Sequence, residues 1–171
     1  MVSFPIKERI PSIITLLNLL AGMLSLFYSL QDDFILAAVM ILIGVLLDGL
    51  DGKAARKLKA TSEFGKQLDS LCDLVSFGVA PAMLVYSWKM EQILLLGAAA
   101  GIIFVICGAL RLARFNVLNI SDYFVGMPIT AAGCFSALLV LVGEALHPLL
   151  VVVIMLAFAF LMICRWKFPK I

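Results

Sequence analysis

Residues 48–73 read DGLDGKAARKLKATSEFGKQLDSLCD, and the rest of the chain is best understood from this stretch. It contains four aspartates, although the 171-residue protein is 64% hydrophobic and only 14% charged. Carboxylates inside apolar membrane segments are costly to bury and usually serve a function. We therefore interpret Asp48, Asp51, Asp69 and Asp73 as a functional site.

The spacing of the aspartates predicts two helical pairs. Asp48 and Asp51 are three residues apart, and Asp69 and Asp73 are four residues apart. At these spacings the two members of a pair lie on the same face of a helix. Two such pairs can converge into a cluster of hard oxygen ligands, which Mg²⁺, Mn²⁺ and Ca²⁺ prefer. Bound cations would also remove the repulsion between the carboxylates.

Ion pairing between helices, with Lys53, Arg56 or Lys66 as the cation, is the alternative explanation for the aspartates. It does not explain why small residues share their helical faces, with Gly52 beside the first pair and Gly65 beside the second. Small residues next to carboxylates leave room for a ligand or for the close approach of two backbones. We therefore favour a ligand site.

The composition defines the class of protein. A mean hydropathy of +1.14 excludes an ordinary soluble domain and indicates a polytopic membrane protein. We expect a single membrane domain that covers residues 1–171. The four cysteines are scattered without a CxxC pair or a Cys/His cluster, so neither zinc nor disulfides are indicated. His147 falls in an expected outer turn, and we assign it no catalytic role.

The apolar runs predict an all-α bundle of six transmembrane helices after a short interfacial segment at residues 1–10. The helices are expected near residues 10–30, 34–56, 64–87, 92–116, 128–144 and 148–165. The run Ala60-Thr61-Ser62-Glu63 offers the chemistry of a helix start before the third helix. With six spans, nearly all lysines and arginines fall on one side and only Lys89 falls on the other. The positive-inside rule then predicts that both termini are cytoplasmic.

The depth of the carboxylates follows from counting residues along the two helices. At 1.5 Å per residue, Asp48 lies about 21 Å and Asp73 about 22 Å from the outer ends of their helices. These two should therefore be level, with Asp51 and Asp69 level one turn nearer the cytoplasm. Since the hydrocarbon core is about 30 Å thick, the cluster should lie just inside its cytoplasmic edge. That depth suits a reaction at a lipid headgroup.

The eight fixed positions in this stretch resemble the motif of the CDP-alcohol phosphotransferases. The positions are Asp48, Asp51, Gly52, Ala55, Arg56, Gly65, Asp69 and Asp73. The resemblance implies an integral membrane enzyme that moves a phosphatidyl-type group from a CDP-linked lipid to a small alcohol and releases CMP. The lipid would be CDP-diacylglycerol or CDP-archaeol, and the family is typically homodimeric.

The resemblance also implies roles for these residues. Asp48, Asp51 and Asp69 would hold two divalent ions, Mg²⁺ or Mn²⁺, with Ca²⁺ as a further candidate. Asp73 would be the general base and a shared metal ligand. The CDP moiety would be bound by small residues and one cation, namely Gly52, Ala55, Gly65 and Arg56. The active site would face the cytoplasm at the cell membrane.

The acceptor alcohol is suggested by other stretches, at 10–22, 68–82, 111–117 and 123–133, which look like phosphatidylserine synthases. This similarity implies L-serine as the acceptor. Arg111 and Arg114 fall near the level of Asp69, where an arginine fork could hold the serine carboxylate. The alternative for both is positive-inside anchoring. Phosphatidylglycerophosphate synthase activity, or another transfer of this class, is the alternative function.

Several alternatives stay open at this point. An intramembrane prenyltransferase would release pyrophosphate in place of CMP, and a carboxylate-lined cation transporter would place its site nearer the midplane. Thr15 and Asn18 lie on one helical face and serve either core hydrogen bonding or substrate contact. Gly97 and Gly101 form a GxxxG pattern that indicates either packing within the chain or a dimer interface.

Overall fold

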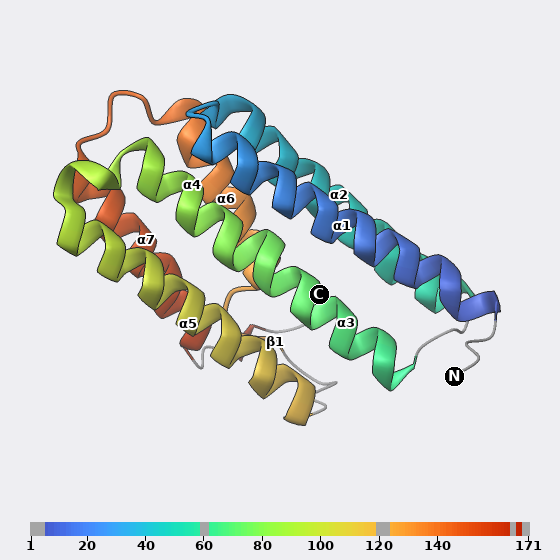
Figure 1. Cartoon of the computed structure of the whole chain (residues 1–171). Coiled ribbons are helices and arrows are strands. Elements are labelled where there is room, and N and C mark those ends of the chain that lie inside the picture. The colour runs from blue at the N-terminus through green and yellow to red at the C-terminus, as the bar shows by residue number, and fades with distance from the viewer. Residues whose placement is uncertain (1–5, 59–61, 119–123, 165–166, 169–171) are drawn as a thin grey trace.

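The computed structural model describes residues 6–58, 62–118, 124–164 and 167–168, and the side chains of 6–10, 54–58, 118, 124–125 and 167–168 are outside this description. It is a bundle of helices (Figure 1). The helical elements are α1 (Ile6–Leu30), α2 (Phe34–Leu58), α3 (Glu63–Asp73), η1 (Leu74–Val79), α4 (Ala80–Trp88), η2 (Met90–Ile93), α5 (Leu94–Leu118), α6 (Ile129–Val142) and α7 (Pro148–Ile163).

The expected membrane bundle is confirmed. Four helical stretches in the described residues are long and apolar enough to cross a membrane, namely Pro11–Leu30, Phe34–Lys53, Glu63–Trp88 and Met90–Val117. The two remaining apolar helices, α6 and α7, have 14 and 16 residues and are shorter than a typical span. Residues 6–10 are the first residues of α1, and the candidate span begins after them at Pro11, so their expected interfacial position stays a prediction. The six-span count and the orientation of the termini stay predictions.

The helices are arranged around one long central rod. α1 and α2 form an antiparallel pair, and α5 and α7 form a second pair on the opposite side (Figure 1). The continuous helical stretch α3–η1–α4 lies between the pairs and packs against α1, while α6 packs against α2 and α4. At the α1–α2 turn, Asp32 has φ 60°, and the carboxylate of Asp33 accepts the Leu36 N–H at 3.1 Å. That bond caps the start of α2.

The start of α3 lies where the sequence predicts it. Ser62 is the N-cap, and its hydroxyl oxygen accepts the Gly65 N–H at 3.1 Å. Glu63 in the first turn forms an ion pair with Lys66 at 2.8 Å. The cap satisfies a backbone donor that a helix end otherwise leaves unpaired. It also fixes the rotation of the helix that carries Asp69.

The central rod contains a π-helical turn, η1, that the sequence analysis did not predict. Pro81 lies just beyond η1 and has no N–H, and its ring cannot tolerate a normally placed carbonyl four residues earlier. The preceding turn is wider, and the Ala80 N–H bonds the carbonyl of Val75, five residues back. This wide turn separates the half of the rod that carries Asp69 and Asp73 from the half that reaches Trp88.

Two glycines from neighbouring helices hold this wide turn on both sides. A Cβ on Gly22 of α1 would lie 2.7 Å from the Cα of Ser76. A Cβ on Gly133 of α6 would lie 2.9 Å from the Cα of Phe77. Contacts this close between backbones are possible only because neither glycine has a side chain. The π turn is therefore enclosed between α1 and α6.

Two short strands join the residues that precede α6 to the residues that follow α7. β1 (Phe124–Val125) pairs antiparallel with β2 (Lys167–Phe168). Gly126 follows β1 with φ +75°, a conformation that favours glycine, and a Cβ there would lie 2.8 Å from the Met162 carbonyl oxygen. Met127 donates its N–H to the Leu161 carbonyl at 3.0 Å. These contacts fix where α6 begins.

The GxxxG pattern in α5 packs within the chain. A Cβ on Gly97 would overlap the carbonyl oxygen of Met90 in η2. A Cβ on Gly101 would lie 3.9 Å from Ala82 of α4. Gly97 thus serves close packing within the chain, whereas a side chain on Gly101 would make only an ordinary van der Waals contact. The expected homodimer stays a prediction, and these two residues do not supply support for it.

Candidate active site

Three of the predicted aspartates converge. Asp48 and Asp51 of α2 and Asp69 of α3 each offer a carboxylate oxygen, and these oxygens lie within 4.8 Å of one another. Asp51 is 5% exposed, and the other two are half-buried. Oδ1 of Asp69 is buried without a hydrogen-bond partner among the described residues. Clustered hard oxygens, one of them unpartnered, fit a divalent cation of the Mg²⁺ or Ca²⁺ type.

The fourth aspartate, Asp73, lies on the same face of α3 and is 8% exposed. Its Oδ1 accepts a hydrogen bond from Nδ2 of Asn18 at 3.3 Å. It is not one of the three residues whose oxygens cluster within 4.8 Å, although it lines the same cavity as Asp69. Its roles as a metal ligand and as a base therefore stay predictions.

The first helix orients two of these carboxylates. The Thr15 hydroxyl lies 2.8 Å from Oδ2 of Asp51 and 3.0 Å from the Pro11 carbonyl oxygen, and it can donate to either. Thr15 and Asn18 are one turn apart on α1, so Asp51 and Asp73 are offset by one turn along it, as the depth count predicts. Of the two interpretations of Thr15 and Asn18, the structure supports hydrogen bonding in the core.

A further partner of the cluster comes from α6 and was missed in the sequence analysis. The Thr130 hydroxyl donates to Oδ2 of Asp48 at 3.4 Å. Thr130 is 82 residues from Asp48 in the chain, so no local spacing links the two. Only its place beside Pro128 at the start of a helix could have drawn attention to it.

A small polar cavity opens beside the aspartates, between α3, α5 and the start of α6. Its volume is about 260 Å³. Its lining combines charged and polar groups with apolar side chains. The lining residues are Lys66, Asp69, Ser70, Asp73, Arg111, Leu112, Phe115, Asn116, Pro128, Ile129 and Thr130. A cavity of this size suits a ligand smaller than a typical drug-sized molecule.

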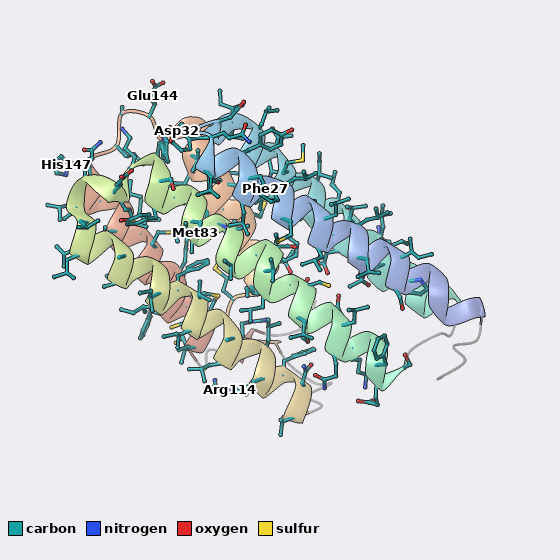
Figure 2. All side chains as sticks on the ribbon, viewed as in Figure 1. Phe27, Asp32, Met83, Arg114, Glu144 and His147 are labelled. Atoms are coloured by element: carbon teal, nitrogen blue, oxygen red, sulfur yellow. The ribbon has the colours of Figure 1, made fainter. Side chains whose placement is uncertain are left out.

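The structure separates the two candidate arginines. Arg111 lines the cavity, and its Nε is buried without a hydrogen-bond partner in the described part of the chain. Arg114 donates to the Ile163 carbonyl at 3.3 Å and is not among the cavity residues. Figure 2 shows Arg114 at the end of α5 opposite to the end where Glu144 and His147 lie. Arg114 thus bonds the last turn of α7, and of these two arginines Arg111 is the one that faces the site.

The residues expected to bind the CDP moiety are only partly described. Gly52 is half-buried on α2 next to Asp51, and Gly65 lies in the capped first turn of α3. Ala55 and Arg56 belong to α2, but their side chains are outside the described part of the structure. Their assignment to the nucleotide stays a prediction. His147 caps α7 by accepting the Leu149 N–H, in keeping with a structural role.

The fold and the site together define a class: a multi-pass helical membrane protein with a carboxylate cation site beside a small polar cavity. Residues 8–164 match the family model described as CDP-alcohol phosphatidyltransferase. The chain belongs to this family, which depends on divalent metals and includes transferases of phospholipid biosynthesis. The acidic cluster fits this metal dependence.

Relatives with printed activities support the same conclusion. The chain is 39% identical over 161 residues to the CDP-diacylglycerol–serine O-phosphatidyltransferase of Bacillus subtilis, covering 94% of this chain and 89% of that protein. It is 41% identical over 140 residues to the enzyme of that name from Helicobacter pylori, covering 80% of this chain but 59% of that protein. It is 38% identical over 165 residues to the archaetidylserine synthase of Methanothermobacter thermautotrophicus, covering 95% of this chain and 70% of that protein.

Proposed function

We propose that this protein transfers a phosphatidyl or archaetidyl group from a CDP-linked lipid to the hydroxyl of L-serine and releases CMP. The observation that carries the proposal is the contact between two features: three clustered aspartates, and a small cavity that contains Arg111. The first can hold cations against a pyrophosphate, and the second can hold a small acceptor with a carboxylate. The names of the relatives support serine as that acceptor.

Asp48, Asp51 and Asp69 would hold two divalent ions, Mg²⁺ or Mn²⁺, with Asp73 as a shared ligand. When bound, such ions neutralise the pyrophosphate and stabilise the departing CMP. Thr15 and Thr130 hold the carboxylates of Asp51 and Asp48 in place. Gly52, Ala55, Gly65 and Arg56 would bind the CDP moiety.

Asp73 would take the proton of the serine hydroxyl as this oxygen attacks phosphorus in line with the leaving CMP oxygen. One phosphorus–oxygen bond forms and one breaks, so no covalent intermediate with the enzyme is needed. Asp73 suits this role because it lines the acceptor cavity and is fixed by Asn18. Trapping a lipid-phosphoryl enzyme when serine is absent would contradict this one-step mechanism.

The site would open to the cytoplasm at the cell membrane, with both termini on that side. Lys66 and Arg111 line the same cavity as Asp69 and Asp73, and the other basic residues of the stretch 53–66 adjoin the aspartates in the sequence, which supports this orientation. The lipid tails would then stay in the bilayer while the headgroup meets the aspartates. Serine would enter from the aqueous side.

The test is one assay of the purified protein in lipid with CDP-diacylglycerol or CDP-archaeol and Mg²⁺ or Mn²⁺. Serine, glycerol 3-phosphate and inositol phosphate are offered in turn, and CMP and the lipid product are measured. We expect CMP and phosphatidylserine or archaetidylserine with serine alone. If only another acceptor gives turnover, that compound and not serine is the acceptor. Release of pyrophosphate would indicate a prenyltransferase. Metal uptake into liposomes without CDP-lipid turnover would indicate a cation transporter.

A further inference from the structure

Besides Arg111, which the proposed reaction already uses, the cavity carries neutral polar groups without an assigned role. Arg111 and Asn116 are on α5, and Ser70 is on α3 next to Asp69. The apolar side chains of Leu112 and Phe115 also line the cavity from α5. A ligand that fills this space therefore meets charged and neutral polar groups from two helices together with apolar side chains.

Arg111 supplies a site for an anion. Its guanidinium is always charged and only donates hydrogen bonds. Its Nε is buried and unpaired, and Arg111 forms no salt bridge among the described residues. A buried donor without a partner is costly, so a ligand acceptor at this position would be favourable. A carboxylate matches the fork of donors on Arg111.

Asn116 supplies a neutral acceptor. Its Nδ2 donates to the Ser70 hydroxyl oxygen at 3.0 Å, which fixes the amide against α3. The amide oxygen lies 3.3 Å from the same hydroxyl and, with two lone pairs, can accept a further hydrogen bond from a ligand. A carboxylate here would attract a metal ion or pair with Arg111, whereas an amide can accept from an ammonium group without doing either.

We propose that Asn116, held by Ser70, binds the α-ammonium group of the acceptor while Arg111 binds its carboxylate. The cavity would thus recognise an amino-acid zwitterion by both charged groups and direct the side-chain hydroxyl towards Asp73. This inference rests on the proposed function. It adds that the enzyme distinguishes serine from hydroxy acids through Asn116 and from amino alcohols through Arg111.

The experiment crosses each residue with the substrate group that it binds. Wild type, Asn116→Leu and Arg111→Gln are assayed with serine, with 3-hydroxypropionate, which lacks the ammonium group, and with ethanolamine, which lacks the carboxylate. Asn116→Leu should lower kcat/KM for serine and ethanolamine about 10- to 100-fold, the usual effect of a hydrogen bond to a charged group. The same variant should have a kcat/KM for 3-hydroxypropionate within about twofold of the wild-type value. Arg111→Gln should lower kcat/KM for serine and for 3-hydroxypropionate and leave kcat/KM for ethanolamine unchanged.

Equal loss for all three acceptors in Asn116→Leu would overturn the assignment, as would a wild type that does not distinguish serine from 3-hydroxypropionate. If the analogues turn over too slowly, binding of alanine and propionate by calorimetry gives the same comparison. A KM for CDP-lipid equal to that of wild type shows that a variant is folded. Ser70→Ala replaces any variant that fails this check, and we expect it to lower kcat/KM for serine and ethanolamine selectively, by about 3- to 10-fold. Absence of CMP release with every acceptor in wild type would instead contradict the proposed function.

Discussion

Nδ2 of Asn18 lies 3.3 Å from Oδ1 of Asp73, and this bond joins the first helix to the last residue before the π turn. Asn18 is fully buried, and its backbone carbonyl also accepts the Ser76 hydroxyl at 3.0 Å. One residue of α1 therefore holds both the proposed base and the wide turn that follows it. Its side chain fixes Asp73 directly, whereas its backbone fixes the helix that carries Asp73.

Asn18→Leu should slow the reaction without weakening the binding of the CDP-lipid. The substitution keeps the approximate size of the side chain and removes the donor to Asp73. Because a misplaced catalytic group loses rate steeply, we expect kcat to fall about 10- to 100-fold with KM for CDP-lipid nearly unchanged. Ser76→Ala is the matched control, since it removes only the bond to the Asn18 backbone. A kcat equal to that of wild type in Asn18→Leu would contradict a positioning role.

Thr15→Val should weaken metal binding, because it removes the hydroxyl that bonds Asp51 and keeps the shape of the side chain. Groups that orient metal ligands typically contribute about 10- to 100-fold in affinity. We expect a loss of this size in Mn²⁺ binding, measured by electron paramagnetic resonance. Thr15→Ser keeps the hydroxyl and should bind Mn²⁺ as wild type does. Equal affinity in both variants would show that Asp51 needs no help from α1.

Asp69→Asn and Asp73→Asn should fail in different ways. Asp69 belongs to the three-carboxylate cluster, so Asp69→Asn should lose Mn²⁺ affinity together with activity. Asp73→Asn should retain most CDP-lipid affinity and lower kcat by about 10²- to 10⁴-fold, the usual contribution of a general base. Chelation by EDTA should abolish wild-type turnover, and added Mg²⁺ or Mn²⁺ should restore it. Near-normal turnover by Asp73→Asn would mean that another group is the base.

Arg111→Gln and Arg114→Gln should affect different properties, the first the KM for serine and the second the thermal stability. Arg111 lines the cavity, so its loss should raise the KM for serine about tenfold or more. Arg114 bonds the Ile163 carbonyl, so its loss should lower the thermal midpoint and leave that KM unchanged. Steady-state kinetics and thermal unfolding in detergent measure the two effects. An equal rise in the KM for serine in both variants would mean that Arg114 also binds the substrate.

Gly133→Ala should destabilise the bundle. A Cβ there would lie 2.9 Å from the Phe77 backbone, and relieving such overlap typically costs about 1–3 kcal/mol. Gly49 is the control, because a Cβ at that position meets no atom within 4 Å. Gly49→Ala should be neutral or raise stability by about 0.5–1 kcal/mol, since alanine favours a helix over glycine. A similar thermal midpoint in the two variants would mean that α6 can move away from the π turn.

Local pattern was enough to predict the helices and the meeting of three of the four aspartates. The intervals 48–51 and 69–73 put each pair on one helical face, and the run 60–63 predicts a helix start that the structure places at Ser62. The contributions of Thr130 and Asn116 were not predicted, because they come from distant parts of the chain and depend on how α5 and α6 pack. Small-residue patterns were also ambiguous, and only packing showed that Gly97 faces Met90.

The two arginines show the same limit. Arg111 and Arg114 are three residues apart and have the same charge, so helical spacing alone gives them one role. The end of α7 decides between them, because its last carbonyls take Arg114 as a donor. Arg111 is then the one that contributes to the cavity wall. Such a division depends on a neighbour nearly 50 residues away in the chain.

The wide turn at Leu74–Val79 also bears on how such a protein can be redesigned. In a regular α-helix, adding or removing one residue rotates everything beyond it by about 100°. A π turn holds one residue more than an α-helical hydrogen-bonded ring, so it absorbs the extra residue locally and keeps the half that carries Asp69 and Asp73 in phase with the half beyond Pro81. Changes of length beyond Pro81, made to match a thicker or thinner bilayer, would leave both carboxylates in register. The inner half could thus be combined with outer halves of different lengths.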